Sequence, residues 1–315
     1  MVARPFHFLS SRYRLFTFGT FVVYTLLVSA FMVWQGIGIL PDRYFLVLLV
    51  PVLLAGRIKS FLVDWVPFVL LLMSYDLLRA LGPFVDARAH YYAALNMDLR
   101  LFHIVPPVWL QQRLTTAPYV KLLNGASTLL YVLHFALPLA FAYVLWVRNR
   151  AQFREFVVTL LVLSYVAWFT YIVFPAAPPW LASREGHLAG VKNLLSDTLG
   201  YFPERIHLPT LYTHLTANDV AAIPSLHAAY PVLVLLFAVR FFGRKGWLFT
   251  PYVLALWFSL VYLGEHYVTD ILIGVGYAVT AFVICVKLCD GLRALPLNQR
   301  VTSWREYLLS GAAVT

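Results

Sequence analysis

Two histidines and an aspartate stand at the ends of apolar stretches of this chain. His227 closes the segment 223–227 (IPSLH), while His266 and Asp270 belong to the segment 264–270 (GEHYVTD). Ionisable side chains are costly in a lipid bilayer and therefore mark candidate functional sites when they occur there. If the three side chains meet at one membrane face, their types favour phosphoryl transfer through a histidine nucleophile.

The four-residue spacing of His266 and Asp270 predicts that both side chains share one face at the start of a helix. A carboxylate that accepts a hydrogen bond from one imidazole nitrogen fixes the tautomer and leaves the other nitrogen free to attack. It also stabilises the positive charge that forms after attack. The alternative is a histidine that caps a helix beside a solvated aspartate.

Pro224 and Ser225 predict that a second helix begins just before His227, because proline is favoured in the first turn. Backbone N–H groups at a helix start bind anions, and the Ser225 hydroxyl adds a donor. Pro231 follows four residues after His227 and should kink this helix. The alternative is an ordinary proline-kinked membrane helix with a histidine at the interface.

The composition is that of an integral membrane protein. Of the 315 residues 61% are hydrophobic and 12% are charged, and the mean hydropathy is +0.77. Soluble domains are about 45–50% apolar and about 25% charged. The pattern predicts an all-α, polytopic helical bundle with between six and eight spans. The apolar segments are 15–38, 40–56, 60–82, 119–147, 156–174, 223–242, 247–264 and 266–288.

The net charge of +10 does not indicate nucleic-acid binding, because the basic residues are scattered at the ends of apolar segments. Their bias, interpreted by the positive-inside rule, predicts that both termini are cytoplasmic. Both polar segments then face the outer side, which is a periplasm, another extracytoplasmic space or a lumen. We predict N-terminal helices and an interfacial segment over 1–118, a catalytic core over 119–290 and a cytoplasmic tail over 291–315.

Two long segments are predicted on the outer side. Within 83–118, Tyr91, Leu95, Leu99 and Phe102 recur at helical spacing, which indicates an amphipathic helix lying on the membrane or one packed on the bundle. The segment 175–222 begins with PAAPPW, whose prolines should end the preceding helix. The remainder of 175–222 is predicted to form a lid over the site.

Together the two polar segments resemble the phosphatidic-acid-phosphatase type 2 superfamily. The matching motifs are PSLH at 224–227 and HYVTD at 266–270. The resemblance implies a six-helix core, extended here by about two N-terminal spans or interfacial helices. It also implies a phosphohistidine intermediate, with His266 as nucleophile, Asp270 as its orienting partner and His227 as general acid and base.

The sequence departs from that superfamily because it lacks several of the basic residues expected to bind phosphate. The motif with Lys and Arg-Pro is not visible, and Leu260 stands where an arginine is expected six residues before the nucleophile. This disfavours a monoester phosphatase, because a dianion gains more from several cations than a diester does. The stretch 171–180 (YIVFPAAPPW) instead resembles inositol phosphorylceramide synthases, which implies headgroup transfer from a phospholipid such as phosphatidylinositol to a lipid or glycolipid hydroxyl.

Several further residues are candidates for substrate binding. Arg184 is a candidate replacement for the missing phosphate clamp. Asp76 and Arg79 are either a headgroup-binding pair or a structural ion pair, and His134 either lines the site or bonds a neighbouring helix. Glu265 could tune His266, although adjacent helical residues face apart. The predicted substrate-binding set is Ser225, Pro179, Trp180, Arg184, Tyr171, Asp76 and Arg79.

The sequence predicts no metal and no cofactor. The loop residues that could ligate a metal lack tight ligand spacing; they are His187, His207, His214, Asp197 and Asp219. The first alternative function is a lipid phosphate or polyprenyl pyrophosphate phosphatase with water as acceptor. The second is a non-catalytic transporter or scaffold, which the intact set of His227, His266 and Asp270 disfavours. The acceptor and the oligomeric state stay open.

Overall fold

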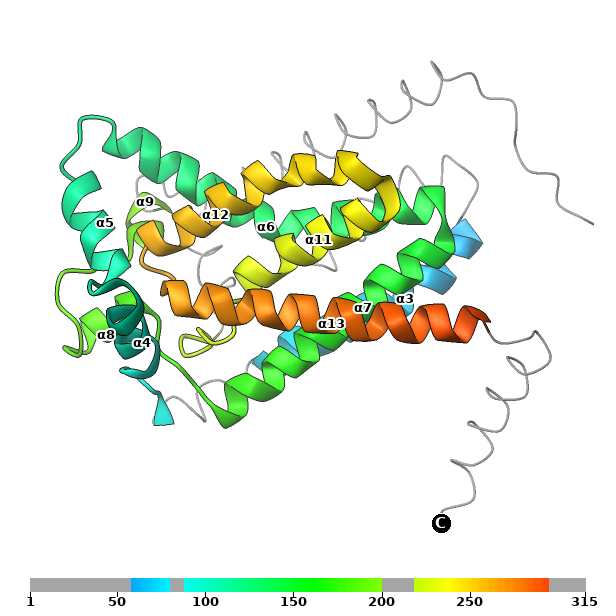
Figure 1. Ribbon diagram of the computed structural model, residues 1–315, viewed down its shortest axis with the longest axis horizontal. Coiled ribbons are helices and arrows are strands. Elements are labelled where there is room, and N and C mark those ends of the chain that lie inside the picture. The colour runs from blue at the N-terminus through cyan, green and yellow to red at the C-terminus, as the bar shows by residue number, and fades with distance from the viewer. Residues whose placement is uncertain (1–57, 80–87, 200–217, 295–315) are drawn as a thin grey trace, which may run out of the picture.

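The computed structural model describes residues 58–79, 88–199 and 218–294, and these are predominantly helical. Figure 1 shows the long helices running alongside one another, with the short helices α4, α5, α8 and α9 gathered at one end. The helices are α3 (Ile58–Arg79), α4 (Ala93–Phe102), α5 (Pro106–Leu114), α6 (Val120–Arg148), α7 (Arg150–Val173), α8 (Pro179–Arg184), α9 (Leu194–Leu199), α11 (Leu226–Phe242), the 3-10 helix η4 (Gly243–Phe249), α12 (Thr250–Tyr262) and α13 (Val268–Ala294).

Among the described residues, three helical stretches are long and apolar enough to cross a membrane: Arg150–Val173, Leu226–Tyr262 and Val268–Gly291. The two halves of α6 meet at a bend of 44° and would together make a fourth. Within the second stretch, η4 turns the chain, and α11 and α12 lie side by side in Figure 1. The predicted apolar segments 15–38 and 40–56 lie outside the described residues. The observed helices confirm an all-α, polytopic membrane protein.

Helix α11 lies at the centre of the bundle and packs against α6, α7, α12 and α13. It is apolar on all sides, as is typical of a helix surrounded by other helices. Leu233, Val234 and Phe237 are completely buried, and Phe156 of α7 and Ala278 of α13 close over them. The central position of α11 means that its N-terminal end is enclosed by the other elements of the core.

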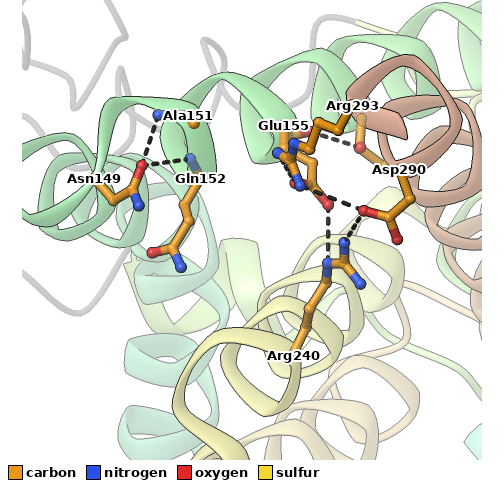
Figure 2. A network of polar contacts seen from close by, with 8 residues as sticks. Asn149, Ala151, Gln152, Glu155, Arg240, Asp290 and Arg293 are labelled. Atoms are coloured by element: carbon orange, nitrogen blue, oxygen red, sulfur yellow. Dashed lines mark hydrogen bonds and ion pairs between the residues drawn. The ribbon is translucent and has the colours of Figure 1, made fainter. Parts of the chain in front are cut away.

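A buried glutamate joins three helices at the end of α11 opposite to His227 (Figure 2). Glu155 of α7, whose side chain is 1% exposed, accepts hydrogen bonds from Arg240 of α11 at 2.9 Å and from Arg293 of α13. Asp290 accepts from the same Arg240 at 2.7 Å. A buried carboxylate needs such partners because desolvating an unpaired charge is very costly. The cluster therefore fixes the ends of α7, α11 and α13 relative to one another.

A second buried carboxylate holds α3 against the bundle. Asp64 accepts hydrogen bonds from Trp146 of α6 at 2.9 Å, from Arg154 of α7 at 3.0 Å and from Arg150. Asn149 separates α6 from α7, and its side chain caps α7 by accepting from Ala151 N at 2.9 Å. These contacts join α3 to α6 and α7 and cap the first turn of α7.

Helix α4 packs on the bundle. Of the two predictions for this segment, a helix on the membrane surface or a helix packed on the bundle, the second describes the structure. Its Asp98 is completely buried and accepts from Val268 N at 3.0 Å, from Thr269 N at 2.9 Å and from the Thr269 hydroxyl at 2.6 Å. A carboxylate there satisfies N–H groups that the first turn of α13 cannot pair internally. The predicted apolar stripe is divided: Leu95 is buried, whereas Leu99 is 40% exposed.

The replacement Asp98→Ala is expected to destabilise the start of α13, because it leaves one buried and one partly buried backbone donor without acceptors. We expect a loss of about 2–4 kcal/mol of folding stability. Hydrogen exchange in nanodiscs should show faster exchange of the Val268 and Thr269 amides. Asn96→Ala, an exposed change on the same helix, is the matched control. Equal protection of the two amides in both variants would contradict the capping role of Asp98.

Candidate active site

The structure brings His227, His266 and Asp270 together at the start of α11 and α13. His227 Nδ1 lies 2.9 Å from His266 Nε2, and His266 Nδ1 lies 3.3 Å from Asp270 Oδ2. His266 is 3% exposed and Asp270 is fully buried. The three polar side chains therefore form one connected group at this end of the helical core.

His266 and Asp270 meet differently from the predicted arrangement on one helix face. Helix α13 begins at Val268, so His266 precedes the helix instead of lying within it. Asp270, the third residue of α13, reaches back and accepts from Tyr267 N at 2.9 Å. This is the reciprocal half of a capping box. The same carboxylate oxygen thus orients the imidazole and closes the first turn of the helix.

The start of α11 is fixed against α13 by backbone contacts. Ser225 N donates to the Asp270 carbonyl at 3.1 Å. A Cβ atom at Gly274 would lie 2.4 Å from the Ser225 carbonyl oxygen, so this approach requires glycine. The buried Ser225 hydroxyl accepts from Ala228 N at 3.3 Å and caps α11, as expected of serine at this position. Its donation to a phosphate stays a prediction.

Tyr171 supports the same turn from α7. Its side chain is 3% exposed and its hydroxyl donates to the Pro224 carbonyl at 2.7 Å. The structure shows Tyr171 holding the peptide that leads into α11, and its predicted role in substrate binding stays a prediction. Helix α7 ends at Val173, so the prolines that follow do end the helix, as predicted.

Two residues of α6 complete the surroundings of His227. The Tyr131 hydroxyl lies 2.9 Å from His227 Nε2, and the His134 ring lies edge-on to the His227 ring with centroids 4.5 Å apart. His134 therefore lines the site, which was one of its two predicted positions. The sequence analysis missed Tyr131. The spacing of Tyr131 and His134, three residues apart in an apolar stretch, could have indicated a shared polar helix face.

The turn before His266 is fastened to the outer loop. Gly264 has a φ of +80°, and a Cβ atom there would lie 2.7 Å from the Lys192 carbonyl oxygen. Gln111 of α5 donates to the carbonyls of Lys192 and Tyr262, both at 2.9 Å, and accepts from Lys192 N at 2.8 Å. Trp180 N donates to the Gly264 carbonyl at 3.0 Å. Gln111, which the sequence analysis also missed, thus links three segments beside the turn that precedes His266.

The remaining predicted binding residues lie in different surroundings. Pro179 begins α8, and both it and Trp180 are buried; the Trp180 N–H bonds the Gly264 carbonyl. Arg184 pairs with Glu185 at 3.0 Å and lies over the Trp180 ring at 5.1 Å, so its described contacts do not reach the histidines. Asp76 and Arg79 fall in α3, but their side chains lie outside the described residues.

The loop residues considered as metal ligands are not gathered into a site in the part of the chain that is described. No group of three or more His, Cys, Asp or Glu side chains there could hold a metal ion. His187 instead stacks on Tyr91, with ring centroids 4.0 Å apart, and its Nδ1 lies 2.9 Å from the Tyr92 hydroxyl. His207 and His214 lie outside the described residues.

The hydrogen-bond chain is consistent with one set of tautomers. His266 Nδ1–H donates to Asp270, which leaves a lone pair on His266 Nε2, and His227 Nδ1–H donates to that lone pair. His227 Nε2 then accepts from Tyr131. A tyrosine hydroxyl can either donate or accept. Tyr131 therefore suits both neutral and protonated His227, as a general acid and base requires.

Comparison with known proteins places the site within a matched region. The PAP2 superfamily model matches residues 93–284, which include the whole hydrogen-bond chain. No solved structure matches the chain.

Among curated proteins, the phosphoinositol dihydroceramide synthase of Bacteroides thetaiotaomicron is 27% identical over 70% of this chain and 75% of its own length. The inositol phosphorylceramide synthase of Candida albicans is 24% identical over 48% of this chain, but over only 33% of its own length. The catalytic subunit of the Schizosaccharomyces pombe enzyme is 27% identical over 50% of this chain and 38% of its own length.

The family match covers more than half of the chain and contains every residue of the connected polar group, so this helical membrane protein is an enzyme that belongs to the PAP2 superfamily.

Proposed function

We propose that this enzyme transfers the phosphoinositol headgroup of phosphatidylinositol to the hydroxyl of a ceramide-type lipid through a phosphohistidine intermediate. The connected chain Asp270–His266–His227–Tyr131 is the observation that carries the proposal. It supplies an oriented nucleophile and a separate acid and base. The similarity to a phosphoinositol dihydroceramide synthase and to inositol phosphorylceramide synthases supports phosphoinositol as the group transferred and ceramide or dihydroceramide as the acceptor.

In the first step the donor phosphate displaces the hydrogen bond between the two histidines. The lone pair of His266 Nε2 attacks phosphorus, and the bond from phosphorus to the diacylglycerol oxygen breaks. Protonated His227 gives its Nδ1 proton to that oxygen, while Tyr131 accepts from Nε2. Asp270 stabilises the charge that develops on His266. General acid catalysis of this kind is typically worth about 10²–10⁴ in rate.

In the second step the acceptor lipid replaces diacylglycerol. Its hydroxyl gives a proton to His227 Nδ1 and attacks the phosphorus of the phosphohistidine. The bond between phosphorus and His266 Nε2 breaks, which restores free His266 and the protonated His227 with which the first step began. The N–H groups at the start of α11 are the proposed site for the phosphate oxygens, because a helix N-terminus favours negative charge.

Transfer in preference to hydrolysis requires that water be excluded from the phosphohistidine. The described parts of the outer loop support such exclusion. Trp180 and the segment around Lys192 are both hydrogen-bonded to the turn that precedes His266. We further propose that this loop lies on the outer face of the membrane and that both termini are cytoplasmic, on the basis of the charge bias.

The function is tested with purified enzyme in lipid nanodiscs that contain phosphatidylinositol labelled in the inositol phosphate, with ceramide or dihydroceramide. We expect diacylglycerol and a labelled inositol phosphate lipid in equal amounts. His266→Ala should form neither product, because no nucleophile remains. His187→Ala, a histidine of the outer loop that contacts Tyr91 and Tyr92, is the matched control. Release of inorganic phosphate from lipid phosphates, with the labelled donor intact, would instead establish a phosphatase.

Tyr131→Phe is expected to lower kcat about tenfold with little change in KM, since one hydrogen bond of roughly 1.4 kcal/mol to the acid and base is lost. As a positioning residue, Tyr131 should also shift the pH dependence of kcat that reports His227. Tyr277→Phe, which removes a hydroxyl contact of the same 2.9 Å length between α13 and α7, is the control. Indistinguishable pH profiles for the two variants would exclude a role of Tyr131 through His227.

A further inference from the structure

Glu265 is a buried acid that the mechanism does not use. It directly precedes His266, yet the two side chains have different partners: His266 contacts His227 and Asp270, whereas Glu265 is hydrogen-bonded to the Asn193 side chain. Glu265 is 6% exposed, and its Oε1 has no hydrogen-bond partner among the described residues. A carboxyl group with one unpartnered oxygen in such a place is costly if it is ionised.

Asn193 and Asp219 belong to two different segments of the outer loop. Asn193 directly precedes α9, and its Oδ1 accepts from Ser196 N at 2.9 Å. The side-chain nitrogen of Asn193 is therefore the donor left for Glu265. Asp219 lies beside Val220, whose carbonyl accepts from Ala176 N at 2.8 Å. Glu265 therefore lies where the two segments approach the turn that carries the nucleophile.

The charges around Glu265 favour its neutral form. Burial raises the pKa of Glu265 to about 8, and the negative charge of Asp219 contributes in the same direction, while the bond from Asn193 opposes both. Asp219 is the charged group that faces Glu265 in the described part of the chain, and the neighbouring Lys192 is exposed. At neutral pH the carboxyl group is therefore mostly protonated, so it does not place a second negative charge beside Asp219.

We propose that Glu265 is a positioning residue which, as an uncharged carboxylic acid, holds the His266 turn against Asn193 and Asp219, and that its ionisation loosens this contact and lowers transfer. The activity readout rests on the proposed transferase function. The contact itself does not, because it concerns only how the turn and the two loop segments are held together.

The direction of the pH effect follows from linkage. The pKa of Glu265 is raised in the folded protein, from an ordinary value of 4.5 to about 8. The folded state then binds more protons than the unfolded state between these values. The stability that Glu265 contributes is fully present below pH 4.5 and is lost as the pH rises through about 8.

The activity test compares wild type and Glu265→Gln in nanodiscs with labelled phosphatidylinositol and ceramide from pH 6 to pH 10, each normalised to its own value at pH 7. If only the protonated form is competent, wild-type kcat should be about tenfold lower at pH 9 than at pH 7. Glutamine cannot ionise, so Glu265→Gln should lack this decline. Asp219→Asn removes the neighbouring charge and should move the decline to lower pH, whereas Asp197→Asn, an exposed acid of α9, should not.

A second measurement does not depend on catalysis. The thermal unfolding midpoint of wild type, relative to that of Glu265→Gln, should fall as the pH rises from about 4.5 to about 8 and then level off. If labelled donor is not turned over by any variant but this difference appears, the proposed function fails together with the effect on transfer, while the inferred contact of Glu265 stands. Parallel midpoint curves for the two proteins, or an unchanged alkaline decline in Glu265→Gln, would overturn the inference.

Discussion

The close approach of α11 to the first turns of α13 determines the geometry of the candidate active site. Ser225 bonds the Asp270 backbone, and the absence of a side chain at Gly274 lets the two backbones touch. That contact brings His227 within hydrogen-bond distance of His266. Reacting groups gain most when they are held in place before the substrate arrives. A bulkier residue at Gly274 would separate the histidines without changing either of them.

Other polar residues stabilise this contact from outside. Tyr171 holds the peptide before α11, Asp98 caps α13, and Gln111 ties the turn before His266 to the loop at Lys192. Each side chain makes hydrogen bonds to backbone atoms, and Asp98 also accepts from the Thr269 hydroxyl. A buried backbone group must be paired, so these side chains allow irregular turns to lie inside an apolar bundle. At the opposite end, the Glu155 cluster prevents α7, α11 and α13 from sliding past one another.

The sequence was sufficient to predict the helical membrane class, the end of α7 at the prolines, and the residues that form the connected group. Those features depend on composition, on local spacing and on side chains that are rare in apolar segments. Asp98, Gln111 and Tyr131 were not predicted, because each acts on a partner more than 90 residues away in the chain. The four-residue spacing of His266 and Asp270 also led to the wrong prediction that His266 lies inside the helix. Asp270 caps the helix at Tyr267, so α13 begins at Val268, two residues after His266.

The stereochemical course at phosphorus tests the covalent role of His266 most directly. The donor would be a phosphorothioate analogue of phosphatidylinositol, prepared as a single diastereomer at phosphorus. It would be converted with ceramide as acceptor, and the configuration at phosphorus in the product would be determined. Two successive in-line displacements, first by His266 and then by the acceptor, each invert phosphorus and together retain its configuration. Retention is the predicted result. Inversion would show that the acceptor attacks the donor directly, and it would contradict the phosphohistidine intermediate.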